Sequence, residues 1–184
     1  MPEKQTIERA RRKKREGQSA TSQAGEFVRE EIHHVREGKH GARSAKQTIA
    51  IGLSKARRAG VDLPPPEKGK TTERTRKSAE RAWRRGQGEP PKRPPSARRS
   101  RAIKNVLKEE GHSAASHKAL SKQAHAAART RTAGERSVAA KKAADTKGPE
   151  ERHEAAMKAV RTKGKEGRSR AARKAARTRA ARGG

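Results

Sequence analysis

The sequence contains no cysteine, so it can form neither a disulfide framework nor a thiolate metal site. That absence suits a reducing compartment, and we expect a cytoplasmic protein. No run of eighteen apolar residues is present, so we expect no membrane span. The first twenty residues are charged from Lys4 onward and lack the apolar core of a secretory signal. Their low acid content loosely resembles a transit peptide, but a basic arm is the simpler interpretation.

Large apolar side chains are almost as scarce. Leu, Ile, Val and Phe account for sixteen of the 184 residues, about 9%, and the chain has one tryptophan and no tyrosine. A fraction below roughly 20%, combined with high net charge, is typical of disordered chains because little apolar surface can be buried. We therefore predict a mainly α and largely disordered chain without a sheet, in which one small helical hairpin is ordered and other short helices form conditionally.

Acidic residues are also few, because 20 Asp and Glu stand against 50 Lys and Arg and the formal net charge is +30. A polyanion is the expected partner, with DNA or RNA ahead of an anionic membrane. The sequence has no glycine-rich phosphate loop and no Ser–His–acid set on a rigid framework. Catalysis requires reacting groups that are held in place, so we predict a protein that is not an enzyme and binds no cofactor.

What the sequence does contain is a four-fold repeat of sixteen residues. The copies begin at Ser121, Ser137, His153 and Ser169. In every copy the fourth and seventh places are Ala, the tenth is Thr and the eleventh is Arg or Lys. The alanines form one narrow stripe that buries too little area for the copies to stack into a core. The repeat therefore predicts four short cationic helices, separated at Gly148 and Gly164.

Composition divides the rest of the chain. We expect a basic arm over residues 1–21, a helical hairpin domain over 22–63, a proline-rich basic linker over 64–99, a short helical segment over 100–120 and the repeat tail over 121–184. The linker holds seven of the nine prolines and a possible short helix between them. Trp83, in that short helix, is interpreted as an exposed aromatic on a tether; stacking on a base is the alternative.

The hairpin is the one place where apolar residues recur at helical spacing. Ser22 is the expected N-cap of its first helix and Gly38 the expected end. Ser44 has the spacing of a capping box with Gln47, and Gly60 fits the close of the second helix. The expected core consists of Phe27, Val28, Ile32, Val35, Ile49, Leu53, Val61 and Leu63. A homodimer through the same faces, aided by Ile51, is a possible arrangement.

The first hairpin helix carries a second, acidic stripe. It consists of Glu26, Glu30, His33 and Glu37, and it could pair with the basic arm of its own or another copy. His33, His34 and His40 lie near these acids in the sequence, and Glu30-x-x-His33 has the spacing of carboxylate-bridged metal sites. Such a site needs a second copy of the motif, which the sequence lacks. A solvated face is the simpler interpretation, and we predict no metal.

The central stretch resembles an uncharacterised small domain of short, basic bacterial proteins. The marks of the resemblance are Glu26–Phe27, Lys39–His40–Gly41, Ser44–Lys46–Gln47 and the segment from Ile51 to Gly60. The resemblance implies no catalytic residues. The tail separately resembles the Ala/Lys-rich tails of linker histones and bacterial histone-like proteins, a likeness that implies DNA compaction.

These observations lead to a functional prediction. We expect a low-specificity, histone-like DNA-binding protein of the bacterial nucleoid, with RNA or ribosome binding and a protein-interaction adaptor acting through the hairpin as alternatives. The lack of aromatic stacking platforms favours duplex DNA over single-stranded RNA. The predicted phosphate-binding residues are Arg11, Arg12, Lys13, Lys14, Arg15, Lys46, Lys55, Arg57, Arg58, Arg129, Arg131, Lys141, Lys142, Lys147, Lys158, Arg161, Lys163, Arg170, Arg173, Lys174, Arg177 and Arg179.

Overall fold

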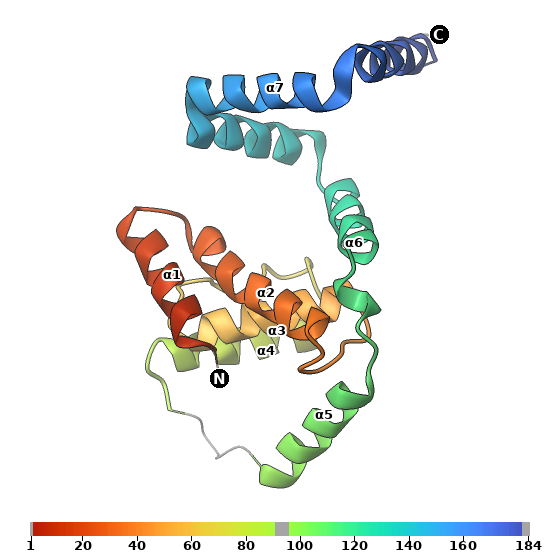
Figure 1. Ribbon diagram of the computed structural model, residues 1–184. Coiled ribbons are helices and arrows are strands. Elements are labelled where there is room, and N and C mark those ends of the chain that lie inside the picture. Colours follow the sequence, from red (N-terminus) through yellow and green to blue (C-terminus); the bar gives the residue numbers. More distant parts are fainter. Residues whose placement is uncertain (1, 91–95, 182–184) are drawn as a thin grey trace. The chain divides into compact units, whose positions relative to one another are not determined.

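The computed structural model describes residues 2–90 and 96–181, and the regular elements in this part of the chain are helices, with no strand (Figure 1). In chain order they are α1 (Lys4–Arg15), α2 (Ala20–Arg36), α3 (Ala45–Arg58), α4 (Glu73–Gly86), α5 (Ala97–Glu109), the 3-10 turn η1 (Ser113–Ala115), α6 (His117–Arg129) and α7 (Ala133–Ala180). The predicted α class is confirmed.

The prediction of a largely disordered chain is not supported. Scarcity of large apolar side chains limits the size of a core, but it does not prevent helices from forming. Ala, Arg, Lys and Glu, which dominate this sequence, are among the residues with the most favourable intrinsic helix propensities. The chain divides into two compact units, residues 1–126 and 127–184, which are described separately below.

The predicted hairpin is present as the pair α2 and α3, which pack against each other. Both helices end at the predicted glycines, because Gly38 and Gly60 have φ values of 75° and 87°, in the left-handed region. The N–H of Val61 donates to the carbonyl of Ala56, as the Schellman close requires. The start of α2 differs from the prediction, since Ser19 rather than Ser22 is its N-cap.

The α2–α3 contact is close because of Gly52. A Cβ atom at this position would lie 2.6 Å from the Cα of Val28 on α2. The small residue therefore lets the two helix backbones approach each other. Phe27 is 1% exposed beside this contact and, together with Val61, belongs to the first of two apolar clusters.

The predicted basic arm contains helix α1, which packs on α2. Thr6 and Ala10 are buried in this contact, and Ile7 packs at its edge. Helix α1 thus contributes Ala10 and Ile7 to the first cluster. A helix with one Ile and one buried Ala gives a weak hydrophobic signal in a sequence, so only the pairing of charges between the basic arm and the acidic stripe was among the expectations.

The predicted linker also contains a packed element. The possible short helix exists as α4, capped by Thr72, and it packs against α3 through the buried residues Ala79 and Ala82. The indole N–H of Trp83 donates to Asp62 at 3.0 Å, so Trp83 is half-buried on the molecule rather than free on a tether. The prolines at 91, 94 and 95 lie outside the described residues.

The segment after the linker supplies the second apolar cluster. Helix α5 begins four residues earlier than predicted, with Ser96 as its N-cap. The turn η1 then contributes Ala114 and Ala115, which pack with Val35 and Ala42 from the hairpin. The predicted boundary between hairpin and short helical segment therefore does not separate independent structures.

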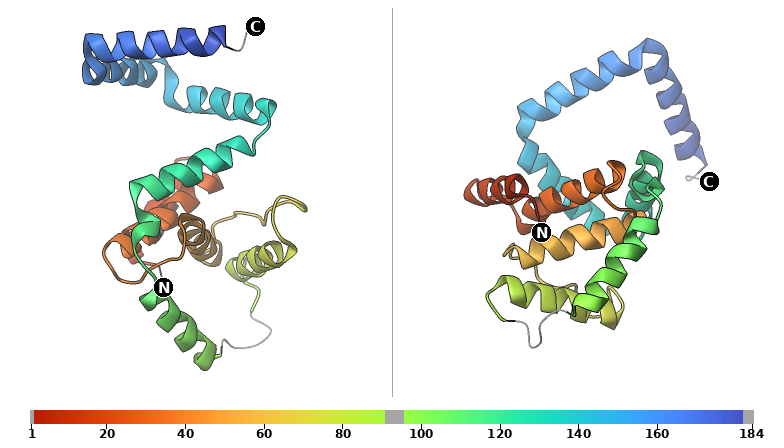
Figure 2. Two further views of the ribbon diagram at one scale, coloured as in Figure 1. Left: turned by 90° about the vertical axis from the view of Figure 1, so that its right-hand side faces the viewer. Right: turned by 60° about the horizontal axis from the view of Figure 1, so that its bottom comes forward.

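The four repeat copies are four helices in series. The first is α6, and Thr132 begins the second with a capping box to Glu135. Gly148 and Gly164 interrupt α7 with φ values of 65° and 60°, so α7 consists of three shorter helices joined at kinks (Figure 2). The predicted separation of the copies at these glycines is confirmed.

One internal hydrogen bond recurs in every copy. The hydroxyl of the threonine in the tenth place donates to a backbone carbonyl one turn earlier, at distances of 2.8 to 2.9 Å. The residues involved are Thr130, Thr146, Thr162 and Thr178. After each internal break an arginine, Arg152 or Arg168, donates back to the carbonyl of the glycine. The threonine and arginine positions that recur in the repeat thus form hydrogen bonds near the ends of the helices.

Candidate nucleic-acid interface

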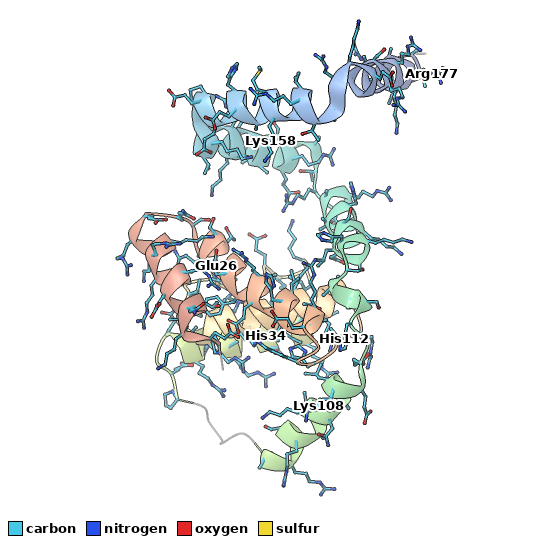
Figure 3. The ribbon with its side chains drawn as sticks, in the orientation of Figure 1. Glu26, His34, Lys108, His112, Lys158 and Arg177 are labelled. Carbon is cyan, nitrogen blue, oxygen red and sulfur yellow. The ribbon has the colours of Figure 1, made fainter. Side chains whose placement is uncertain are left out.

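Helix α7 presents its basic side chains to solvent. None of the residues 133–180 is buried, and long side chains project from the helix on several sides, as at Lys158 and Arg177 (Figure 3). The predicted phosphate-binding residues that are exposed here are Lys141, Lys142, Lys147, Lys158, Arg161, Lys163, Arg170, Arg173, Lys174, Arg177 and Arg179. Arg129 and Arg131, which precede α7, are exposed as well.

Acidic groups in this unit are few and remain in solvent. Residues 127–184 contain eighteen basic and six acidic residues. The ion pair between Arg170 and Glu166 is open, with side chains that are 80% and 91% exposed. Exposed pairs of this kind contribute little to stability, so they do not hold the basic groups away from a ligand.

The basic residues of α1 fall into two groups, those exposed to solvent and one that forms an ion pair with α2. Arg11, Lys14 and Arg15 are exposed, and Arg12 is exposed beside Glu16, with 3.7 Å between the charged atoms. Lys13 instead lies 2.6 Å from Glu26 on α2. The outer face of α1 is therefore available to an anion, while Lys13 faces into the molecule.

Two predicted phosphate-binding residues of α3 are occupied inside the protein. Lys55 forms ion pairs with Glu30 and Glu31, at 3.4 and 2.5 Å. Arg57 is 7% exposed and donates to the carbonyls of Leu63 and Pro64, and burial lowers the pKa of its guanidinium. Both side chains serve the fold, so we correct the prediction and leave them out of the interface.

Lys46 and Arg58, also on α3, are exposed as predicted. Partial enclosure lowers the pKa of the Arg58 guanidinium, and repulsion from Arg85 on α4 lowers it further. Two guanidinium groups from different helices thus lie within electrostatic range of each other. A phosphate between them would relieve the repulsion, and sequence spacing gave no sign of this pair.

The acidic stripe of α2 pairs with the chain's own basic helix. Arg9 and Lys13 of α1 contact the buried Glu26 at 2.9 and 2.6 Å. Burial raises the pKa of Glu26, but the hydrogen bonds from Lys13 and Arg9 outweigh it and leave the pKa below its ordinary value. Glu26 thus pairs with two cations of α1 inside the molecule, while Arg11, Lys14 and Arg15 stay exposed on the outer face of that helix.

Comparison with known proteins identifies one part of the chain. Residues 11–68 match the model of a family of unknown function (DUF6496). The resemblance to an uncharacterised domain is thereby confirmed for this segment. Neither the curated proteins nor the solved structures yielded a match to this chain. Among the described residues, no helix has both the length and the apolar character needed to cross a membrane.

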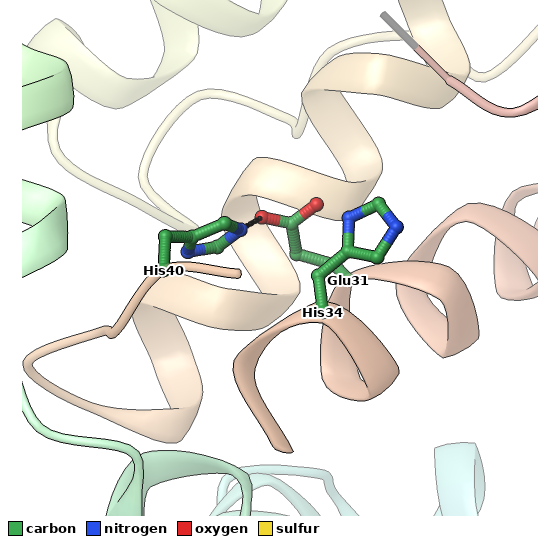
Figure 4. Close-up of side chains that lie close together, drawn as sticks. All are labelled: Glu31, His34 and His40. Atoms are coloured by element: carbon green, nitrogen blue, oxygen red, sulfur yellow. Dashed lines mark ion pairs between the residues drawn. The ribbon is translucent and has the colours of Figure 1, made fainter. Parts of the chain in front are cut away.

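The DUF6496 segment contains the hairpin and the last turns of α1, but not α4 or η1. Within it the structure brings Glu31, His34 and His40 together, with one ligand atom from each lying within 4.8 Å of the others (Figure 4). His33, which the sequence interpretation paired with Glu30, is exposed on another face of α2. The sequence signal for this cluster is the spacing of Glu31 and His34, because residues three apart lie on the same face of a helix.

Proposed function

We propose that the protein is a non-enzymatic, low-specificity DNA-binding protein of the nucleoid, which neutralises phosphates with the helices of residues 117–180. The observation that carries the proposal is α7, a 48-residue helical segment without a buried side chain, in a unit where basic residues outnumber acidic ones three to one. The cations of this segment lie in solvent, and a dense polyanion would supply partners for them.

The geometry of the repeat supports an extended ligand. A helix of sixteen residues is about 24 Å long, whereas duplex DNA carries one negative charge for about every 1.7 Å of its axis. Each copy therefore meets more phosphates than it has cations, and four copies in series follow the backbone further than one compact domain does. The glycine joints at Gly148 and Gly164 provide places where the chain changes direction.

The first unit adds a second basic surface. Three of its glutamates, Glu26, Glu30 and Glu31, are buried against cations of the same unit. Arg11, Lys14 and Arg15 on α1 and the pair of Arg58 and Arg85 remain on the outside. We assign these residues a supporting role in phosphate binding.

A salt-titrated gel shift on duplex DNA tests the proposal. If six to ten phosphates are contacted, affinity falls roughly 10³–10⁵-fold between 50 and 200 mM salt. An affinity that does not respond to salt contradicts it. Competition with a structured RNA of equal length distinguishes DNA from RNA, because preferential displacement by the RNA favours the ribosome-binding alternative.

A truncated variant separates the two units. A chain that ends at Arg131 keeps every helix that packs around α2 and α3 and loses the basic tail. On the proposed function its affinity for DNA drops by at least tenfold. If DNA affinity is instead retained by this variant, the first unit is the binding domain. Retention of a protein partner in place of DNA points to the adaptor alternative.

A further inference from the structure

We propose that Glu31, His34 and His40 form a binding site for a divalent transition-metal ion of the Zn²⁺ type. Glu31 and His34 lie one turn apart on α2, and His40 follows Gly38 in the connection to α3. Figure 4 shows both imidazole rings turned toward the Glu31 carboxylate. The ring centroids are 6.3 Å apart and the ring planes are nearly perpendicular, at 82°.

The hydrogen bonds of His40 leave a bare nitrogen in the site. Its Nδ1 lies 2.9 Å from the carbonyl oxygen of Gly41, which can only accept, so Nδ1 carries the proton and donates. In the neutral ring Nε2 then has a lone pair, and this atom lies 2.9 Å from Oε1 of Glu31. Two lone pairs at that distance repel each other unless a cation lies between them.

His34 is arranged in the same way. Its Nε2 lies 2.9 Å from Oε1 of Glu3, an oxygen that also accepts a hydrogen bond from the Lys39 ammonium at 3.2 Å, so this oxygen is an acceptor and Nε2 donates to it. The other nitrogen, Nδ1, faces the Glu31 carboxylate in Figure 4. A histidine whose outer N–H is fixed by an oxygen acceptor, with its bare nitrogen turned inward, is the usual arrangement of a metal ligand.

The local charge favours a cation. Glu30 and Glu31 are 4% and 1% exposed, and Lys55 is the ammonium group that the structure places against both of them. With neutral imidazoles this leaves one buried negative charge without compensation, and an isolated buried charge is costly. Lys55 contacts Oε2 of Glu31, and Oε1 is the carboxylate oxygen that faces Nε2 of His40 and would bind the metal together with it.

The donor set selects the class of metal. Two imidazole nitrogens and one carboxylate oxygen suit Zn²⁺ and its first-row neighbours better than Mg²⁺ or Ca²⁺, which prefer oxygen ligands. With metal–ligand bonds of about 2.0–2.1 Å, tetrahedral ligand atoms lie roughly 3.3 Å apart. Atoms already within 4.8 Å of one another reach that spacing by small side-chain rotations.

A bound ion would tie α2 to the hairpin turn. This turn also contacts the end of α5 and the residues after it, because the N–H of Gly41 donates to the carbonyl of Leu107 and that of Ala42 to the carbonyl of Gly111. The metal would therefore stabilise the junction between the hairpin and the second apolar cluster. This role is independent of nucleic-acid binding.

Zinc binding by the full-length protein, without nucleic acid, tests the site. Competition with a chromophoric chelator is expected to give one Zn²⁺ per chain for the wild type and for His33→Ala, the control on the adjacent exposed histidine. His40→Ala and Glu31→Gln are expected to weaken binding at least 100-fold. Equal binding by these variants and the wild type, or an equal loss in His33→Ala, overturns the proposal.

Two further measurements keep the result interpretable. Glu3→Gln retains all three ligands and is expected to weaken Zn²⁺ binding about tenfold by releasing His34, which a loss of folding would not imitate when helix content by circular dichroism is unchanged. Co²⁺ substitution is expected to give the intense visible absorption of a four-coordinate site. If the wild type binds no Zn²⁺, the proposal fails. Nitrogen chemical shifts that show His40 doubly protonated at neutral pH would then identify a proton, rather than a metal, as the link between His40 and Glu31.

Discussion

The two units of this protein are built from the same kind of element and use charge in opposite ways. In residues 1–126 several helices share two small apolar clusters, and buried glutamates take up cations from neighbouring helices. In the described part of the second unit, residues 127–181, no side chain is buried and the cations face solvent. Helix formation alone therefore does not distinguish a folded domain from a polyelectrolyte; the location of the acidic partners does.

The largest expected difference between the units concerns apolar truncation. Phe27→Ala removes the largest buried side chain of the first cluster and is expected to lower the free energy of unfolding by about 3–5 kcal/mol. Val138→Ala, at a site that is 67% exposed on α7, is expected to change it by less than about 0.5 kcal/mol. Urea unfolding followed by the fluorescence of Trp83 for the first unit, and by circular dichroism at 222 nm for α7, measures the two effects. Equal effects would show that α7 has a core of its own.

Close helix packing offers a second test. Gly52→Ala places a Cβ against the backbone of Val28 and is expected to cost about 1–3 kcal/mol. Gly25→Ala is the matched control, because Gly25 lies in α2 with nothing within 4 Å of a new Cβ. It is expected to stabilise the unit by up to about 1 kcal/mol through helix propensity. Thermal unfolding of both variants decides whether α2 and α3 approach as closely as described.

Acid pH tests the internal pairing of charges. The pKa of Glu26 is below its model-peptide value of 4.5 in the folded protein. Its contribution to stability is therefore present above that value and is lost as pH falls through the lower, folded pKa. Glu26→Gln is expected to cost about 1–2 kcal/mol at neutral pH and to reduce the loss of stability below pH 4.5. A wild type and variant with parallel pH profiles would exclude Glu26 as a source of acid sensitivity.

The smallest effect is expected at the joints of the tail. Gly164 has φ 60° and ψ −179°, a conformation that is nearly restricted to glycine, so alanine there favours a continuous helix. Gly164→Ala is expected to raise helix content slightly, without changing the unfolding of the first unit. In Gly148→Ala the gain should be smaller, because Pro149 disfavours helix in the residue before it. Circular dichroism at 222 nm compares the two variants.

Much of the hairpin was predictable because its signals are local. Gly38 and Gly60 end helices, Ser44 caps α3, and the apolar spacing marks Phe27 and Val35. The repeat boundaries were predictable for the same reason. Capping and helix-ending interactions span only a few residues, so the sequence shows them directly.

What could not be predicted depends on contacts between distant segments. Alanines such as Ala10, Ala79 and Ala115 are buried by packing, yet a small side chain looks alike in a core and on a surface. From the sequence, Lys55 and Arg57 were interpreted as surface cations. In the structure they contact Glu31 and the carbonyl of Leu63, which are supplied by other segments. The cluster of Glu31, His34 and His40 was missed because it depends on the turn between α2 and α3.

The glycine joints of α7 have a consequence for how such a chain changes in evolution. Each copy carries its own internal threonine bond, and the later copies begin at a glycine or a capped threonine. Since no copy of α7 supplies a buried residue to another, a sixteen-residue unit can be gained or lost without disturbing a core. The length of ligand that the tail contacts can therefore change by one sixteen-residue copy at a time. Such a change leaves the core of the preceding unit unaltered, so the two units can evolve independently.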